Sequence, residues 1–133
     1  MKPEAKKLNV LVVDDEASVL VTYKLILQQQ GYEVVAAATS KDAIEALGKR
    51  SFDLILCDFS LEQQHSGFEV IEVARHNDPR VPCVLLTGYA TLETAEQAKQ
   101  NGIEVLFKPI DIAEFLNTTA TLLRSKDESN KEG

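Results

Sequence analysis

The chain has 133 residues, 44% of them hydrophobic, and a formal net charge of −7. This length fits one domain with its own core, and the negative charge argues against non-specific binding to nucleic acid, which requires a basic surface. No apolar run approaches the length of a membrane span, and residues 1–7 lack the pattern of a signal peptide, so we expect a cytoplasmic protein with no membrane partner. Cys57 and Cys83 lie inside apolar runs and are expected to be buried thiols of a reducing compartment.

Short apolar runs alternate with helical patterns along the chain, which predicts five strands and five helices. In chain order, the strands are expected over 8–13, 33–37, 53–57, 81–86 and 103–107. The helices that follow them are expected over 17–30, from Thr39 or Ser40 to about 49, from about 68 to the break at Asp78-Pro79, over 92–100, and from a cap at Asp111 to about 124. The folded domain is therefore expected over 8–124. Residues 1–7 and the polar segment 125–133 are expected to be a flexible segment and a disordered tail.

Strict alternation of strands and helices predicts a parallel sheet covered by helices on both faces. Right-handed crossovers leave few topologies for such a chain. The expected fold is therefore α/β, a flavodoxin-like, doubly wound, five-stranded parallel sheet with strand order 2-1-3-4-5 and five helices. This order places the ligand-binding switch point between the first and third strands.

Acidic residues end those same two strands. Asp14 and Asp15 follow the first apolar run, and Asp58 follows the third. Helix capping would explain one residue of the Asp14-Asp15 pair, but it explains neither the pair nor Asp58, whose helix starts several residues later. Three carboxylates at one sheet edge repel one another, and a divalent cation such as Mg²⁺ relieves that repulsion. The sequence thus predicts a metal site, with Thr87 and Lys108 ending the fourth and fifth strands in the same layer.

This set of motifs resembles the receiver domain of two-component response regulators, and the resemblance covers residues 8–124. The motifs that carry it are Asp14-Asp15, Asp58, Thr87-Gly88 and Lys108-Pro109, in that order.

The resemblance implies a role for each site residue. Asp58 would accept a phosphoryl group from a histidine kinase or a histidine phosphotransfer protein. Asp15 and Asp58 would bind Mg²⁺ directly, Asp14 would act mainly through water, and the backbone carbonyl of Ser60 would be the third protein ligand.

On the same grounds, Thr87 would hydrogen-bond the phosphoryl group and Lys108 would pair with it. Receivers usually carry an aromatic residue three positions before this lysine, where the present chain has Val105. The implied protein catalyses only its own phosphorylation and dephosphorylation. Phosphorylation would switch binding to a downstream protein target, with no direct contact to nucleic acid, in a monomer or a phosphorylation-dependent dimer.

Three alternatives stay open at this point. The chain could be a receiver excised from a hybrid histidine kinase or a larger regulator. An aspartate-nucleophile phosphohydrolase would need Asp-x-Asp after the first strand, where the chain has Asp14-Asp15-Glu16. A flavodoxin-like nucleotide or flavin binder would need a glycine-rich or hydroxyl-rich loop at the same place.

Overall fold

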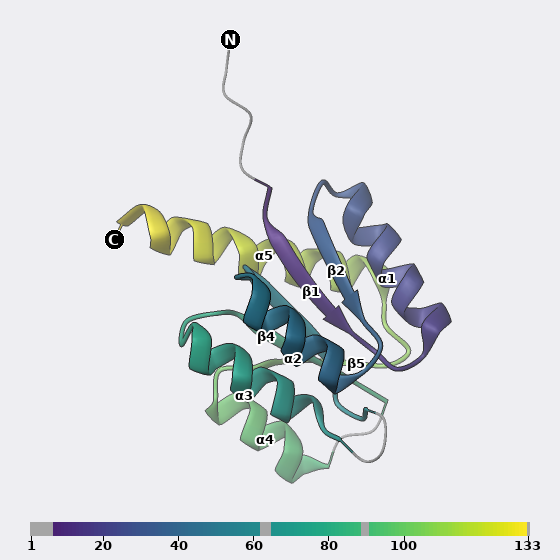
Figure 1. Cartoon of the computed structure of the whole chain (residues 1–133). Coiled ribbons are helices and arrows are strands. Elements are labelled where there is room, and N and C mark those ends of the chain that lie inside the picture. Colours follow the sequence, from purple (N-terminus) through teal and green to yellow (C-terminus); the bar gives the residue numbers. More distant parts are fainter. Residues whose placement is uncertain (1–6, 62–64, 89–90, 133) are drawn as a thin grey trace.

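The computed structural model describes residues 7–61, 65–88 and 91–132. It shows five parallel strands in the order β2-β1-β3-β4-β5, with helices on both faces (Figure 1). The elements are β1 (Asn9–Val13), α1 (Ala17–Gln29), β2 (Glu33–Ala37), α2 (Ser40–Lys49), β3 (Leu54–Asp58), α3 (Gly67–Asn77), β4 (Cys83–Thr87), α4 (Leu92–Gln100), β5 (Glu104–Phe107) and α5 (Ile112–Glu132). The predicted flavodoxin-like strand order and helix count are confirmed.

The strands bury side chains on both faces of the sheet, which is why their sequences are continuously apolar. In β1, Val10 and Val12 belong to one buried cluster, while Leu11 and Val13 belong to the other. The first cluster lies beneath α1 and α5, and the second beneath α2, α3 and α4. Each fully buried Leu or Val contributes about 1.5–3 kcal/mol relative to an exposed one, so the central strands anchor the fold.

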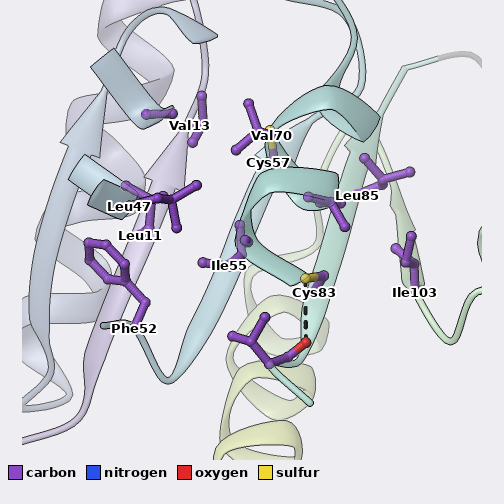
Figure 2. Close-up of a cluster of buried hydrophobic side chains, with 14 of the residues drawn as sticks. Leu11, Val13, Leu47, Phe52, Ile55, Cys57, Val70, Cys83, Leu85 and Ile103 are labelled. Atoms are coloured by element: carbon purple, nitrogen blue, oxygen red, sulfur yellow. Dashed lines mark hydrogen bonds between the residues drawn. The ribbon is translucent and has the colours of Figure 1, made fainter. Parts of the chain in front are cut away.

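Both cysteines are free and buried in the same cluster, as the sequence predicts. Figure 2 shows them among the aliphatic side chains, where the Sγ of Cys83 donates a hydrogen bond to the carbonyl oxygen of Val81 at 3.5 Å. Cys57 lies directly before Asp58 in β3, and its Sγ donates to the Asp58 carbonyl oxygen at 3.4 Å.

Glycines follow two of the helices, and side-chain caps begin two others, at the positions that the sequence indicates. Gly31 has φ +92° just after α1, and Gly102 has φ +67° just after α4, a left-handed conformation that glycine adopts without steric cost. Thr39 caps α2 by accepting a hydrogen bond from the Asp42 amide at 3.0 Å. Asp111 accepts one from the Glu114 amide, also at 3.0 Å, at the start of α5.

Several boundaries differ from the sequence prediction, most of them by one or two residues; β4, for example, covers Cys83–Thr87 rather than 81–86. Asp58 is the last residue of β3 rather than the residue after it. The backbone of α5 is helical as far as Glu132, whereas the sequence predicts an end near Arg124 and a tail after it. No proline or glycine interrupts 125–132, and the first glycine in this stretch is Gly133, so propensity alone does not stop the helix there. Residues 1–6 of the expected flexible segment lie outside the described residues.

Among the described residues, every helix is too short or too polar to cross a membrane.

Candidate functional site

Three carboxylates meet at the carboxyl edge of the sheet. Asp14 and Asp15 directly follow β1, and Asp58 ends the neighbouring strand β3. One carboxylate oxygen from each of the three lies within 4.8 Å of the other two. Asp14 and Asp58 are buried, while Asp15 is exposed. The juxtaposition expected from the strand order is therefore present.

Backbone contacts hold Asp14 at the base of this acidic pocket. Its amide donates to the Ala37 carbonyl oxygen at 3.2 Å, and its Oδ1 accepts from the Glu16 amide at 2.9 Å. The N-cap of α1 is Glu16, which makes no capping hydrogen bond through its side chain. Asp15 is therefore left with its carboxylate at the exposed side of the pocket rather than used as a helix cap.

Lys108, which follows β5, reaches across the pocket to two of the acids. Its Nζ lies 3.2 Å from Oδ2 of Asp14 and 3.3 Å from Oδ1 of Asp58, and its backbone amide donates to the Thr87 carbonyl oxygen at 2.7 Å. Burial lowers the pKa of Lys108, but the adjacent Asp58 and Asp14 carboxylates outweigh it, and the net pKa is raised above its usual value. The pocket thus holds one ammonium and three carboxylates, and negative charge is in excess.

The excess of negative charge contributes to a raised pKa at Asp58. Burial, followed by repulsion from Asp14, raises the pKa of Asp58 from 3.8 to about 6, although Lys108 opposes the shift. A carboxylate kept ionised at neutral pH against such a penalty attracts a cation strongly. Clustered carboxylate oxygens are also the ligands that hard divalent cations prefer, so the donor set fits Mg²⁺.

Thr87 and the aromatic residue Phe107 lie beside this pocket. Thr87 ends β4, is 4% exposed and pairs in register with Phe107 of β5. Phe107 is 56% exposed, whereas Val105 is partly buried against the cluster beneath α2, α3 and α4. Val105 occupies the position three residues before Lys108, where receivers usually carry an aromatic residue, and the strand register pairs Thr87 with the aromatic Phe107 instead.

The loop after Asp58 is closed by its own backbone. Ser60 and Ser66 form an antiparallel bridge, and the Leu61 amide donates to the His65 carbonyl oxygen at 2.8 Å. Ser60 is exposed, two residues beyond Asp58, and its role as a metal ligand stays a prediction. Residues 62–64 of this loop lie outside the described residues.

Gly67 is a site residue that the sequence analysis missed. It begins α3, and a Cβ at this position would lie 2.4 Å from the backbone oxygen of Asp58 and 3.0 Å from Cδ2 of Leu85. Its amide donates to the Phe59 carbonyl oxygen at 2.8 Å. Only glycine allows α3 to start against the Asp58 backbone, and the signal in the sequence was a glycine directly after the Ser66 cap.

Tyr23 is a buried aromatic residue of α1. Its ring stacks on Phe115 of α5, with centroids 5.0 Å apart and an interplanar angle of 21°. Burial raises the pKa of its hydroxyl, and the charges of Lys108, Asp14 and Asp58 act on it too. The phenol is therefore a neutral group within electrostatic range of the acidic pocket.

This fold and this pocket define an α/β domain with a candidate metal site at the carboxyl edge of a parallel sheet. The family model described as the response regulator receiver domain matches residues 10–120. The chain belongs to the family of response regulator receiver domains.

Relatives and solved structures agree with that assignment. The transcriptional regulatory protein ZraR of Escherichia coli O157:H7 is 34% identical over 116 residues, which are 86% of this chain and 25% of the relative. The response regulator protein PilR of Pseudomonas aeruginosa is 31% identical over 123 residues, 92% of this chain and 27% of the relative. The chain thus spans about a quarter of the length of these curated relatives. A CheY-like receiver domain protein from Methanospirillum hungatei JF-1 superposes with a TM-score of 0.86 at 30% identity, covering 96% of this chain and 100% of that one.

Proposed function

We propose that Asp58 is the phosphoacceptor of this receiver domain. The observation that carries the proposal is the position of Asp58 at the end of β3, in the acidic pocket and 3.3 Å from the Lys108 ammonium. Its pKa of about 6 leaves the carboxylate largely ionised at neutral pH, as a nucleophile requires.

In the proposed reaction, an Asp58 carboxylate oxygen attacks the phosphorus of a phosphohistidine on a partner protein. A P–O bond forms, the P–N bond breaks, and the imidazole leaves with the electron pair of that bond and takes up a proton. Lys108 is close enough to pair with the transferred phosphoryl oxygens, and the Thr87 hydroxyl donates a hydrogen bond to them. Later hydrolysis of the acyl phosphate returns the free carboxylate, so the domain turns over only its own phosphoryl group.

Four groups would hold the metal. Asp15 and Asp58 would bind Mg²⁺ directly, Asp14 would act mainly through water, and the Ser60 carbonyl would complete the protein ligands. The clustering of three carboxylates within 4.8 Å supports this assignment, because a divalent cation relieves their mutual repulsion. When bound, the cation neutralises negative charge that develops on the phosphoryl oxygens.

The partners follow from the family. The phosphodonor is a histidine kinase or a histidine phosphotransfer protein, and the output is altered binding to a downstream protein target by a monomer or a phosphorylation-dependent dimer. The curated relatives include transcriptional regulators about four times longer than the matched region, which supports a receiver that works within, or together with, a larger cytoplasmic regulator.

Intact-mass analysis after incubation with Mg²⁺ and acetyl phosphate tests the assignment. The expected result is a single phosphoryl adduct that is absent in Asp58→Asn and without Mg²⁺. Asp42→Asn, which removes a carboxylate from the first turn of α2, is the control and should keep the adduct. A stoichiometric adduct that persists in Asp58→Asn would overturn the proposal, and sustained hydrolysis of phosphate esters would indicate a phosphohydrolase instead.

A further inference from the structure

A hollow of about 750 Å³ lies between α2 and α3, and none of the residues of the acidic pocket lines it. The two helices lie side by side over one face of the sheet (Figure 1). Ile44 of α2 and Val73 of α3 supply apolar lining, and Ile44 is 38% exposed, one of the few large hydrophobic side chains left at the surface of the described residues. We refer to this feature as the α2–α3 groove.

Charged residues surround the apolar lining of the α2–α3 groove, and most of them are acidic. Glu45 of α2 and Glu69 and Glu72 of α3 line it, together with one lysine, Lys41, and two histidines, His65 and His76. Glu69 accepts hydrogen bonds from the Ser66 amide at 3.1 Å and from Nδ1 of His65 at 2.9 Å, and the bond from His65 is the main cause of its lowered pKa. The salt bridges formed between described residues involve neither Glu45 nor Glu72. These two carboxylates are therefore available to a partner.

Two contacts within the domain hold the helices that form the walls of the groove. The Asn77 side chain at the end of α3 donates to the Leu47 carbonyl oxygen of α2 at 3.1 Å, which ties the two carboxyl-terminal ends together. At its other end, α3 is seated on β3 by the close approach of Gly67 to the Asp58 backbone. A preformed groove binds a partner without the cost of ordering its own walls.

We propose that the α2–α3 groove binds a cationic amphipathic helix of a partner protein. The apolar face of that helix would cover Ile44 and Val73, while its Lys or Arg side chains would pair with Glu45 and Glu72. Two adjacent helices form an elongated groove, and helix-in-groove recognition is a common use of such a surface. The acidic rim disfavours nucleic acid, phosphopeptides and anionic membranes, since like charges repel. The inference is independent of phosphorylation at Asp58.

A fluorescently labelled synthetic peptide tests the proposal. The probe is a helix of Leu and Lys with the leucines in one stripe, added to the full chain with saturating Mg²⁺ so that the acidic pocket is occupied. Binding is expected by fluorescence anisotropy, with backbone amide shifts in ¹H–¹⁵N spectra centred on Ile44 and Val73. Glu45→Lys and Glu72→Lys are each expected to weaken binding about tenfold at low ionic strength. Glu96→Lys, an equal charge reversal at an exposed position on α4, should leave the affinity unchanged.

Several results would overturn the docking proposal. Equal affinity in Glu45→Lys and the wild type would show that the acidic rim is not used. Equal binding of a peptide with the same composition but scattered leucines, or of a Leu–Glu peptide, would show that the groove does not select a cationic amphipathic helix. Shifts confined to other surfaces would place the peptide elsewhere. All three variants alter exposed glutamates, and each should still accept a phosphoryl group from acetyl phosphate. The docking proposal can therefore be refuted without refuting Asp58 as the phosphoacceptor, and the reverse also holds.

Discussion

Replacing Asp58 with asparagine is expected to stabilise the metal-free protein at neutral and alkaline pH. Burial and the charge of Asp14 raise the pKa of Asp58 from 3.8 to about 6 in the folded protein. Because the folded state holds this proton more tightly than the unfolded chain does, the associated stabilisation is complete below pH 3.8 and is lost as the pH rises through about 6. A difference of roughly two pKa units corresponds to at most about 3 kcal/mol of unfolding free energy, and screening by solvent reduces this value.

Asparagine carries no charge, so it removes the cost of holding Asp58 ionised in the folded protein while keeping the shape of the side chain. The gain is reduced because Lys108 loses a partner at 3.3 Å, so a net stabilisation of about 1–3 kcal/mol above neutral pH is expected. Urea unfolding of the wild type and Asp58→Asn, in the presence of a chelator and from about pH 4 to about pH 8, measures the difference. Glu96→Gln, which removes an exposed carboxylate from α4, is the control for the change in net charge.

The two stability curves should separate as the pH rises through about 6. Adding Mg²⁺ should narrow the gap or reverse its sign, because the cation binds the folded wild type more tightly than the variant. If the curves of the wild type and Asp58→Asn run parallel over the whole pH range in chelator, Asp58 does not carry the raised pKa and the electrostatic account of the acidic pocket is incorrect.

Three further substitutions test other parts of the site. Asp15→Asn should weaken Mg²⁺ binding by about tenfold in a titration, since a charged ligand is lost, and an unchanged affinity would contradict its metal role. Gly67→Ala should lower stability by about 1–3 kcal/mol and slow phosphorylation, because its Cβ would lie 2.4 Å from the Asp58 carbonyl oxygen, whereas Gly48→Ala in open space on α2 should be neutral or stabilising. Lys108→Ala should still accept some phosphoryl group. In the wild type we expect beryllofluoride to change hydrogen exchange in α4, and Lys108→Ala should lose that change. If the change survives in the variant, Lys108 does not transmit the switch.

Much of the fold can be inferred from the sequence because its signals are local. Strands buried on both faces must be continuously apolar, so β1, β3 and β4 are visible as runs of Val, Ile and Leu. Alternation with helices then leaves few right-handed topologies, and the strand order follows. Sequence signals locate the ends of helices less well than their centres. The sequence predicts that α5 ends near Arg124, whereas the helix reaches Glu132.

The strand order also predicts that Asp14, Asp15, Asp58 and Lys108 meet at the carboxyl edge of the sheet. All four residues lie at or just beyond the carboxyl ends of parallel strands. Sequence could not supply the distances or the balance of charge, because these depend on how far each side chain reaches across the pocket. The position of α3 against Asp58, which makes Gly67 necessary, and the α2–α3 groove also depend on how separate elements pack. Residue type and strand order thus determined which groups meet, while tertiary packing decided their spacing, their burial and therefore the pKa of Asp58.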